Sequence, residues 1–291
     1  MKHKKPILFF MVFFTLGISG LFAQYEFIQQ EGSWYSNGLG NSFGFRTPNE
    51  VIFRELDGWL ITHVIKTGTY SIDHEYNIPF INFNWVDGTV DRYLMLATAE
   101  LIVLYSSNTE PTWVLRRGWE GTYGEILTFF SYASTIFASS TLKEGNLFYE
   151  ASSERLGLNI NRVWAVEGGI GESLYVELTR FKEFYISGGY VHFSRPYLFI
   201  QNSRPKKVRI YSNFNRTLFY DVELCDTPNF QVIIPFTDDI DSIEWKVLDS
   251  ATRITPGNIR RTSLTIEILE VYPGTIYNHM CINSIVGFST W

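Results

Sequence analysis

The chain has 291 residues, of which 45% are hydrophobic and only 19% are charged, so it can bury the core of one large or two ordinary domains. This balance excludes a chain that is disordered as a whole. The formal net charge of −6, from 30 acidic and 24 basic residues, disfavours a nucleic-acid partner, because such binding rests on a basic surface. Aromatic residues reach 17%, which favours β-structure.

The first 23 residues have the pattern of a cleavable export signal. Lysines at the start form a positive region, residues 6–21 are almost wholly apolar, and small residues then lead to a cleavage site after Ala23. The apolar run is short for a membrane span, and no later stretch is apolar enough to form one. We expect a signal peptide over 1–23 and a mature protein that is secreted or periplasmic, without a transmembrane segment.

Residues 24–122 are predicted to form a small antiparallel, barrel-like β-domain. The expected strands lie at 50–53, 59–65, 68–72, 79–85, 92–96 and 100–105. Asp57-Gly58 and Asp87-Gly88 are turn signals, and the glycine- and asparagine-rich run 37–44 indicates a loop. A barrel of this size is either filled by its own side chains or holds an apolar ligand.

The order of short motifs in this domain resembles lipocalin-like domains of bacterial exported proteins. The motifs are Gly-Ser-Trp-Tyr at 32–35, Gly-Thr-Tyr-Ser-Ile at 68–72, and Trp-Val-Asp-Gly at 85–88 followed by Tyr93-Leu94-Met95-Leu96. Residues 106–124 are rich in serine, glycine and arginine and are predicted to connect this domain to a second one.

The second domain, 123–291, is predicted to be a jelly-roll β-sandwich. Residues 125–138 form either a helix or a strand. Short strands without a helix among them are expected at 174–179, 183–187, 197–201, 207–212, 219–223, 230–235, 242–248 and 263–272. The stretch from Trp164 to Glu172 has three glycines, which let a backbone adopt positive φ or approach another backbone closely, and it is expected to be a tight loop.

Seven motifs in a fixed order carry a second resemblance. They are Ser139-Ser140-Thr141-Leu142, Tyr149-Glu150-Ala151, 164–172, 186–190, 202–208, Leu224-Cys225-Asp226-Thr227-Pro228, and 271–277 with Cys281-Ile282. Residues 139–285 thereby resemble the discoidin-like (F5/8 type C) glycan-binding module described for the translocation domain of streptococcal NAD glycohydrolases, which occurs in many bacterial exported proteins. The resemblance implies a module that binds a glycan or glycoconjugate and has no enzymatic activity.

A glycan site needs planar hydrogen-bonding groups and an aromatic face. Residues of these types lie at strand ends or in loops of the second domain, where most of them can face one rim. The candidate ligand-binding residues are Trp164, Glu167, Glu172, Asn202, Arg204, Asp226, Tyr272 and Tyr277. For each of them a structural role is the alternative, such as a core position for Trp164, a salt bridge for Glu172 and a solvated strand end for Arg204.

The end of the domain departs from the family pattern. After Tyr277 the family has two acidic residues and a threonine, and it has a glutamate just past the Cys-Ile pair. Here Asn278, His279 and Met280 take the first places and Ser284 the last. The alternative to glycan binding is therefore an envelope or secreted protein–protein interaction module that has lost sugar binding. An enzyme with an unrecognised site is a third hypothesis.

The sequence has no motif for a catalytic centre, a cofactor or a zinc ion. The acidic run Asp238-Asp239-Ile240-Asp241 lacks the spacing of an EF-hand and indicates a solvated turn. Discoidin-like folds can hold a structural cation, so calcium stays open. The chain has two cysteines, Cys225 and Cys281, which we expect to be free thiols.

Overall fold

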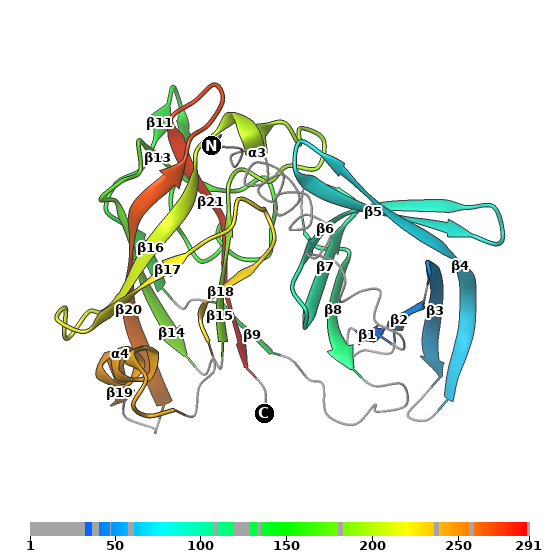
Figure 1. The fold of residues 1–291 in the computed structure, drawn as a ribbon, viewed down its shortest axis with the longest axis horizontal. Coiled ribbons are helices and arrows are strands. Elements are labelled where there is room, and N and C mark those ends of the chain that lie inside the picture. Colours follow the sequence, from blue (N-terminus) through cyan, green and yellow to red (C-terminus); the bar gives the residue numbers. More distant parts are fainter. Residues whose placement is uncertain are drawn as a thin grey trace, which may run out of the picture.

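The computed structural model describes residues 33–36, 41–46, 48–57, 61–107, 110–118, 129–132, 135–179, 183–235, 239–255 and 259–289. The signal peptide expected over 1–23 lies outside these residues. A closed barrel stands beside a sandwich of two sheets, which confirms the all-β prediction (Figure 1). Over the described ranges, no helix has both the length and the hydropathy that a bilayer crossing requires.

The barrel consists of eight strands that follow one another around it in sequence order. They are β1 (Ser33–Ser36), β2 (Asn41–Arg46), β3 (Glu50–Asp57), β4 (Ile61–Glu75), β5 (Ile78–Trp85), β6 (Val90–Ala97), β7 (Leu101–Tyr105) and β8 (Trp113–Gly118). Pairing of β8 with β1 closes the barrel. Its interior is packed with aromatic rings, among them Phe43, Phe45 and Phe83, which are all at most 3% exposed.

Three expectations for the barrel are wrong in detail. The break expected between 59–65 and 68–72 is absent, because Gly68 lies inside β4, where a Cβ atom would come within 2.3 Å of the Asn84 carbonyl oxygen. This glycine permits a close approach of two strands and does not end one. Within the expected loop 37–44, strand β2 already begins at Asn41, and β8 occupies part of the expected connector 106–124.

The sandwich is formed by two antiparallel sheets, in the orders β10-β14-β20-β16-β17 and β13-β21-β15-β18, with β19 beside β20 and β9 beside β21. Its strands are β9 (Phe129–Tyr132), β10 (Thr135–Ala138), β13 (Trp164–Glu167), β14 (Ser173–Thr179), β15 (Glu183–Gly188), β16 (Arg204–Ser212), β17 (Phe219–Glu223), β18 (Gln231–Ile234), β19 (Thr252–Thr255), β20 (Ile259–Tyr272) and β21 (His279–Ser289). A separate short hairpin joins β11 (Lys143–Glu144) to β12 (Leu147–Phe148). The sequence does not predict β21, since Asn283, Ser284 and Gly287 interrupt its apolar pattern.

Two segments that were expected to be strands are helical. Within the expected strand 242–248, Ser242 caps α4 (Ile243–Ala251): its hydroxyl accepts the backbone N–H of Trp245, and the other residues are helical. The apolar residues of this segment alternate as in a strand, but the buried residues Val247 and Ala251 are four apart and share one helix face. Residues 197–201 form the single turn α3 (Leu198–Gln201).

An apolar core joins the barrel to the sandwich. The barrel contributes Ile78, Phe80, Leu94, Leu96, Leu101, Val103 and Tyr105, and the sandwich contributes Leu158, Ile160, Tyr185, Val191, Phe199, Phe230 and Val286. Strand β5 is buried on both faces, because Phe83 points into the barrel core and Phe80 into this shared core. The Tyr105 hydroxyl donates to the Leu158 carbonyl at 2.6 Å, and the Asn229 side chain accepts the Ala97 N–H at 3.0 Å. The barrel and the sandwich are therefore packed as one unit.

Candidate functional site

Trp164 lies in the core of the sandwich. It begins β13, its side chain is fully buried, and its indole N–H donates to the Ser140 carbonyl at 2.9 Å. The surrounding core cluster contains residues of both sheets. The ring has no exposed face on which a sugar could stack in this structure.

The glycine-rich loop after β13 carries the chain from one sheet to the other. The Gly168 N–H donates to the Asn278 carbonyl beside β21, and the Gly171 N–H donates to the Ile268 carbonyl of β20. Gly168, Gly169 and Gly171 all have positive φ values, of 75°, 88° and 85°. The Glu172 carboxylate accepts the Ser139 hydroxyl, whereas Glu167 is exposed. The loop is thus an inter-sheet corner, and of its two carboxylates only Glu167 is exposed without a partner among the described residues.

Alanine substitutions at two glycines of this corner separate crowding from backbone strain. A Cβ at Gly169 would meet the Met280 Cβ at 2.4 Å, whereas a Cβ at Gly171 would meet nothing within 4 Å. Gly171→Ala should cost about 1–2 kcal/mol for the left-handed backbone alone. Gly169→Ala should cost about 1–3 kcal/mol more, because Met280 must move. Urea unfolding of the two variants measures the difference, and equal losses would contradict the contact with Met280.

Arg204, at the start of β16, is the centre of a buried hydrogen-bond network. Its side chain is 8% exposed and forms a two-pronged ion pair with Asp226, with N–O distances of 2.8 and 2.6 Å. Its Nη1 atom also donates to the carbonyls of Asn202 at 2.8 Å and of Pro273 at 3.3 Å. Asn202 is buried and caps α3 through its own bond to the Leu198 carbonyl. The structure therefore brings Asn202, Arg204 and Asp226 together, with their polar atoms bonded to protein.

The two tyrosines predicted to bind a ligand, Tyr272 and Tyr277, have different surroundings. The Tyr272 hydroxyl donates to the Leu224 carbonyl at 2.9 Å and so belongs to the framework of strand ends. Tyr277 is 43% exposed, and its ring stacks on His279 with a centroid distance of 5.7 Å. His279 in turn lies 3.7 Å from Glu144 of β11. Of the predicted ligand residues, Glu167, Asp226 and Tyr277 are exposed, and Asp226 is already paired with Arg204.

The residues that depart from the family pattern have structural contacts. The Asn278 carbonyl accepts the Gly168 N–H, and Met280 is fully buried beneath Gly169. Ser284 is also fully buried, and its hydroxyl accepts the Asn283 amide at 2.9 Å. Met280 and Ser284 thus pack with neutral side chains, whereas Asn278 is exposed and contributes its backbone.

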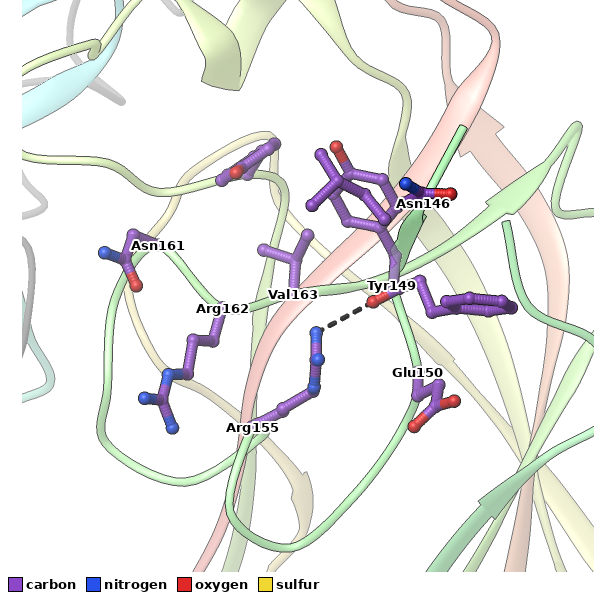
Figure 2. A pocket seen from close by; sticks show the side chains of 10 residues that line it. Asn146, Tyr149, Glu150, Arg155, Asn161, Arg162 and Val163 are labelled. Carbon is purple, nitrogen blue, oxygen red and sulfur yellow. Dashed lines mark hydrogen bonds between the residues drawn. The ribbon is translucent and has the colours of Figure 1, made fainter. Parts of the chain in front are cut away.

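A pocket of about 370 Å³ opens beside the β11–β12 hairpin (Figure 2). It is lined by residues 146–150, Arg155, residues 161–163 and Tyr190. Val163 forms part of an apolar cluster with Cys281, against which Tyr149 and Tyr190 pack. In Figure 2 the Arg155 side chain reaches towards the chain at Tyr149, where its Nη1 atom donates to the Phe148 carbonyl at 2.9 Å. The pocket therefore combines aromatic rings with guanidinium and amide groups.

Burial is the main factor that holds the tyrosines of this pocket in their neutral form. Burial, together with the hydrogen bond to Glu144 at 3.0 Å, raises the pKa of Tyr149 to about 12. Burial also raises the pKa of Tyr190, and the positive charge of Arg195 partly opposes this effect. Both hydroxyls are therefore hydrogen-bonding groups, not bases, near neutral pH.

The sequence did not predict this pocket, because 150–163 reads as a polar loop without periodicity. A local signal was present at Asn161, which has a left-handed φ of 68° and whose N–H donates to the Val191 carbonyl at 2.9 Å. Asparagine is one of the few residues that adopt this conformation readily. The contribution of Tyr190 could not be read locally, since it comes from a segment beyond β15.

Within the described ranges, no three His, Cys, Asp or Glu side chains gather as a metal site would require. Of the acidic run expected to form a turn, Asp239 accepts the Asp241 N–H at 3.0 Å just before α4, and Asp238 lies outside the described residues. Both cysteines are free thiols, as predicted. Burial raises the pKa of Cys281, so it remains protonated, whereas Cys225 is exposed.

His192, close to the pocket, makes the stability of the fold depend on pH. It is 6% exposed, its Nε2 atom accepts the Arg195 Nε–H at 3.0 Å, and its Nδ1 atom is buried without a described partner. Burial first, and the charge of Arg195 second, lower its pKa from 6.5 to about 4. Between these values the unfolded chain binds a proton that the folded chain does not, so this group lowers stability as pH falls from 6.5 towards about 4.

We expect His192→Gln to reduce the loss of stability on acidification by up to about 1.4 kcal/mol per pH unit in that window. Urea midpoints at about pH 7 and about pH 5 measure this loss. The matched control is His63→Gln, because His63 is exposed. Between the two pH values this variant should lose as much stability as the unmodified protein. A His192→Gln variant with the same acid sensitivity as the unmodified protein would count against a buried neutral imidazole.

Comparison with known proteins identifies the second domain. Two solved structures of a mutant of the arabinofuranosyltransferase AftD from Mycobacteria are similar to the chain, at 8% and 9% identity and TM-scores of 0.32 and 0.31. Each match covers 58% of this chain but only 12% or 13% of the other, so the chain spans a small share of the length of those proteins. No curated protein matches the chain.

Residues 130–288, more than half of the chain, match the family described as the NAD glycohydrolase translocation F5/8 type C domain. They include all seven motifs that carry the discoidin-like resemblance, and the two-sheet sandwich has the fold that the resemblance implies. The chain therefore belongs to the NAD glycohydrolase translocation F5/8 type C domain family.

Proposed function

We propose that this protein binds a glycan without catalysis, through its discoidin-like domain. The observation that carries the proposal is the pocket of about 370 Å³ beside the β11–β12 hairpin. Its volume is within the range of small-molecule sites. Its position also changes the expected location of the site, from the strand ends around Arg204 to the segment between β12 and β13.

The residues of the pocket have the chemistry that sugar recognition needs. Tyr149 and Tyr190 supply rings for the C–H face of a sugar, and both pack on the apolar cluster that includes Val163. Asn161 and Arg155 supply planar groups that form directed hydrogen bonds to hydroxyls. Tyr277 connects to this region through His279, Glu144 and Tyr149. This series of contacts links the pocket to one of the predicted ligand residues.

A glycan array tests the proposal with the mature full-length chain, with and without calcium. We expect binding to a defined set of glycans that Asn161→Gly weakens about tenfold, since glycine tolerates the left-handed backbone and only the amide is lost. Asn77→Gly is the matched control, because Asn77 also has a φ of 68° but lies in the β4–β5 turn. Absence of binding in both conditions would refute glycan binding.

Absence of catalysis is part of the proposal. The family is named for translocation, and of the two carboxylates at the inter-sheet corner, Glu172 is hydrogen-bonded to Ser139. Assays of NAD and glycoside hydrolysis test this point. Turnover that Glu167→Gln abolishes would show an enzyme instead.

Export is a further part of the proposal, because a glycan partner outside the cell requires it. Its support is the signal-peptide pattern of residues 1–23. Sequencing of the N-terminus of the protein recovered outside the cytoplasm should give a chain that begins at Gln24. A chain that remains in the cytoplasm with Met1 intact would contradict export.

A protein–protein interaction module is the second candidate, and exposed apolar residues at the same rim favour it. Ile170 in the inter-sheet corner is 66% exposed, Ile276 is 62% exposed and Leu147 is 63% exposed. If the module binds a protein, a pull-down with the native chain should recover one protein from the envelope fraction. The double variant Ile170→Ser, Ile276→Ser should not recover it. Glycan binding that appears only after Asn278→Asp and His279→Asp would also support this candidate, as a module that has lost its sugar.

A further inference from the structure

Several arginines on the sheets pair with carboxylates, but those of the pocket do not. Arg92, Arg204, Arg209 and Arg261 each form an ion pair, with Glu75, Asp226, Asp221 and Glu177, respectively. Arg155 and Arg162 line the pocket, and neither makes an ion pair with any residue that the structure describes. Arg155 and Arg162 differ from other arginines without an ion pair because both line one cavity, where a ligand can meet their charges.

A third guanidinium lies at the Tyr190 side of the pocket. The charge of Arg195 acts on the Tyr190 hydroxyl, and its Nε atom donates to the neutral His192 ring at 3.0 Å. Arg195 too makes no ion pair within the described ranges. Of the acidic groups nearby, Glu144 accepts the Tyr149 hydroxyl and lies 3.7 Å from His279, and Glu150 lines the pocket. The three guanidiniums of Arg155, Arg162 and Arg195 therefore outnumber these two carboxylates.

We infer that this pocket selects a glycan that carries an acidic group, a carboxylate or a sulfate, and that Arg162 binds this group. The inference rests on the proposed glycan-binding function and names its ligand class. A guanidinium presents several N–H donors in one plane, which matches the oxygens of a carboxylate or sulfate. Arg155 is partly used by the Phe148 carbonyl, whereas Arg162 is exposed and has no described side-chain partner, so its guanidinium is available.

Paired oligosaccharides test this inference. The mature full-length chain is titrated by calorimetry with oligosaccharides that contain glucuronate or sulfated sugars, and with the same oligosaccharides after carboxyl reduction or desulfation. We expect the acidic member of a pair to bind at least about tenfold more tightly. Arg162→Gln should remove most of that preference without loss of folding, because the residue is exposed. Arg260→Gln, at an exposed position on β20, is the matched control and should keep the preference.

The possible results separate this inference from the function on which it rests. Acidic and neutral members that bind equally well, with binding lost in Asn161→Gly, would overturn the acidic selectivity and leave glycan binding in place. A preference for the acidic members that survives in Arg162→Gln would place the acidic group elsewhere and overturn the role of Arg162. Failure of every oligosaccharide to bind would refute both proposals.

Discussion

Trp164→Ala is expected to lower the free energy of unfolding by about 3–5 kcal/mol, the range for removal of a large aromatic side chain from a core. The side chain is fully buried among residues of both sheets, so the cavity cannot open to solvent. The Ser140 carbonyl also loses its indole donor. Since a domain is stable by about 5–15 kcal/mol, this loss is a large share of the total. Urea unfolding of the full chain measures it.

Phe137→Ala is the control for Trp164→Ala. Phe137 lies on β10 of the same domain, but it is 62% exposed. Its removal should change stability by no more than about 0.5 kcal/mol. Comparable losses in the two variants would show that Trp164 is not a core residue and would return it to the set of ligand-binding candidates.

Arg204→Ala is expected to cost about 3 kcal/mol, because it leaves the Asp226 carboxylate and several inward-facing carbonyls without their donor. The value lies at the low end for a buried ion pair, since the Asp226 side chain is 33% exposed and can be partly solvated. Arg204→Lys should recover only part of the loss, because an ammonium group cannot reproduce the two-pronged geometry. Thermal and urea unfolding measure both variants.

Arg209→Ala supplies the comparison for Arg204→Ala on the same strand. Arg209 also pairs with an aspartate, Asp221, at 2.8 Å, but its side chain is 33% exposed. A surface pair of this kind contributes about 1 kcal/mol or less. If Arg204→Ala instead leaves stability intact and removes glycan binding, Arg204 is a ligand residue. The hydrogen bonds around it then do not stabilise the fold.

The β-class could be predicted because it follows from local patterns. Alternating residues along β5 and turn signals such as Asp87-Gly88, whose glycine has a φ of 84°, are readable without tertiary information. The errors arise where tertiary contacts override a local signal. Gly68 continues β4 because another backbone approaches it, and α4 is decided by its Ser242 cap and buried face.

The site was less predictable, for a related reason. Polar residues at strand ends are equally suited to bind a ligand or to bond the ends of other strands, and residue type does not distinguish the two. Arg204 and Tyr272 have the second role in this structure, through Asp226 and the Leu224 carbonyl. The pocket is assembled from an irregular segment and Tyr190, whose proximity depends on how that segment folds over β13 and β21.

The core shared by the barrel and the sandwich limits how this chain can be divided. Phe199, Phe230 and Val286 of the family-matched region are each at most 4% exposed, and they are covered in part by Phe80, Leu94 and other barrel residues. A fragment cut at the family boundary would present this apolar area to water and would also lose the bond between Asn229 and Ala97. Such a fragment is expected to self-associate, so the barrel acts as a built-in solubilising cover for the domain that it precedes.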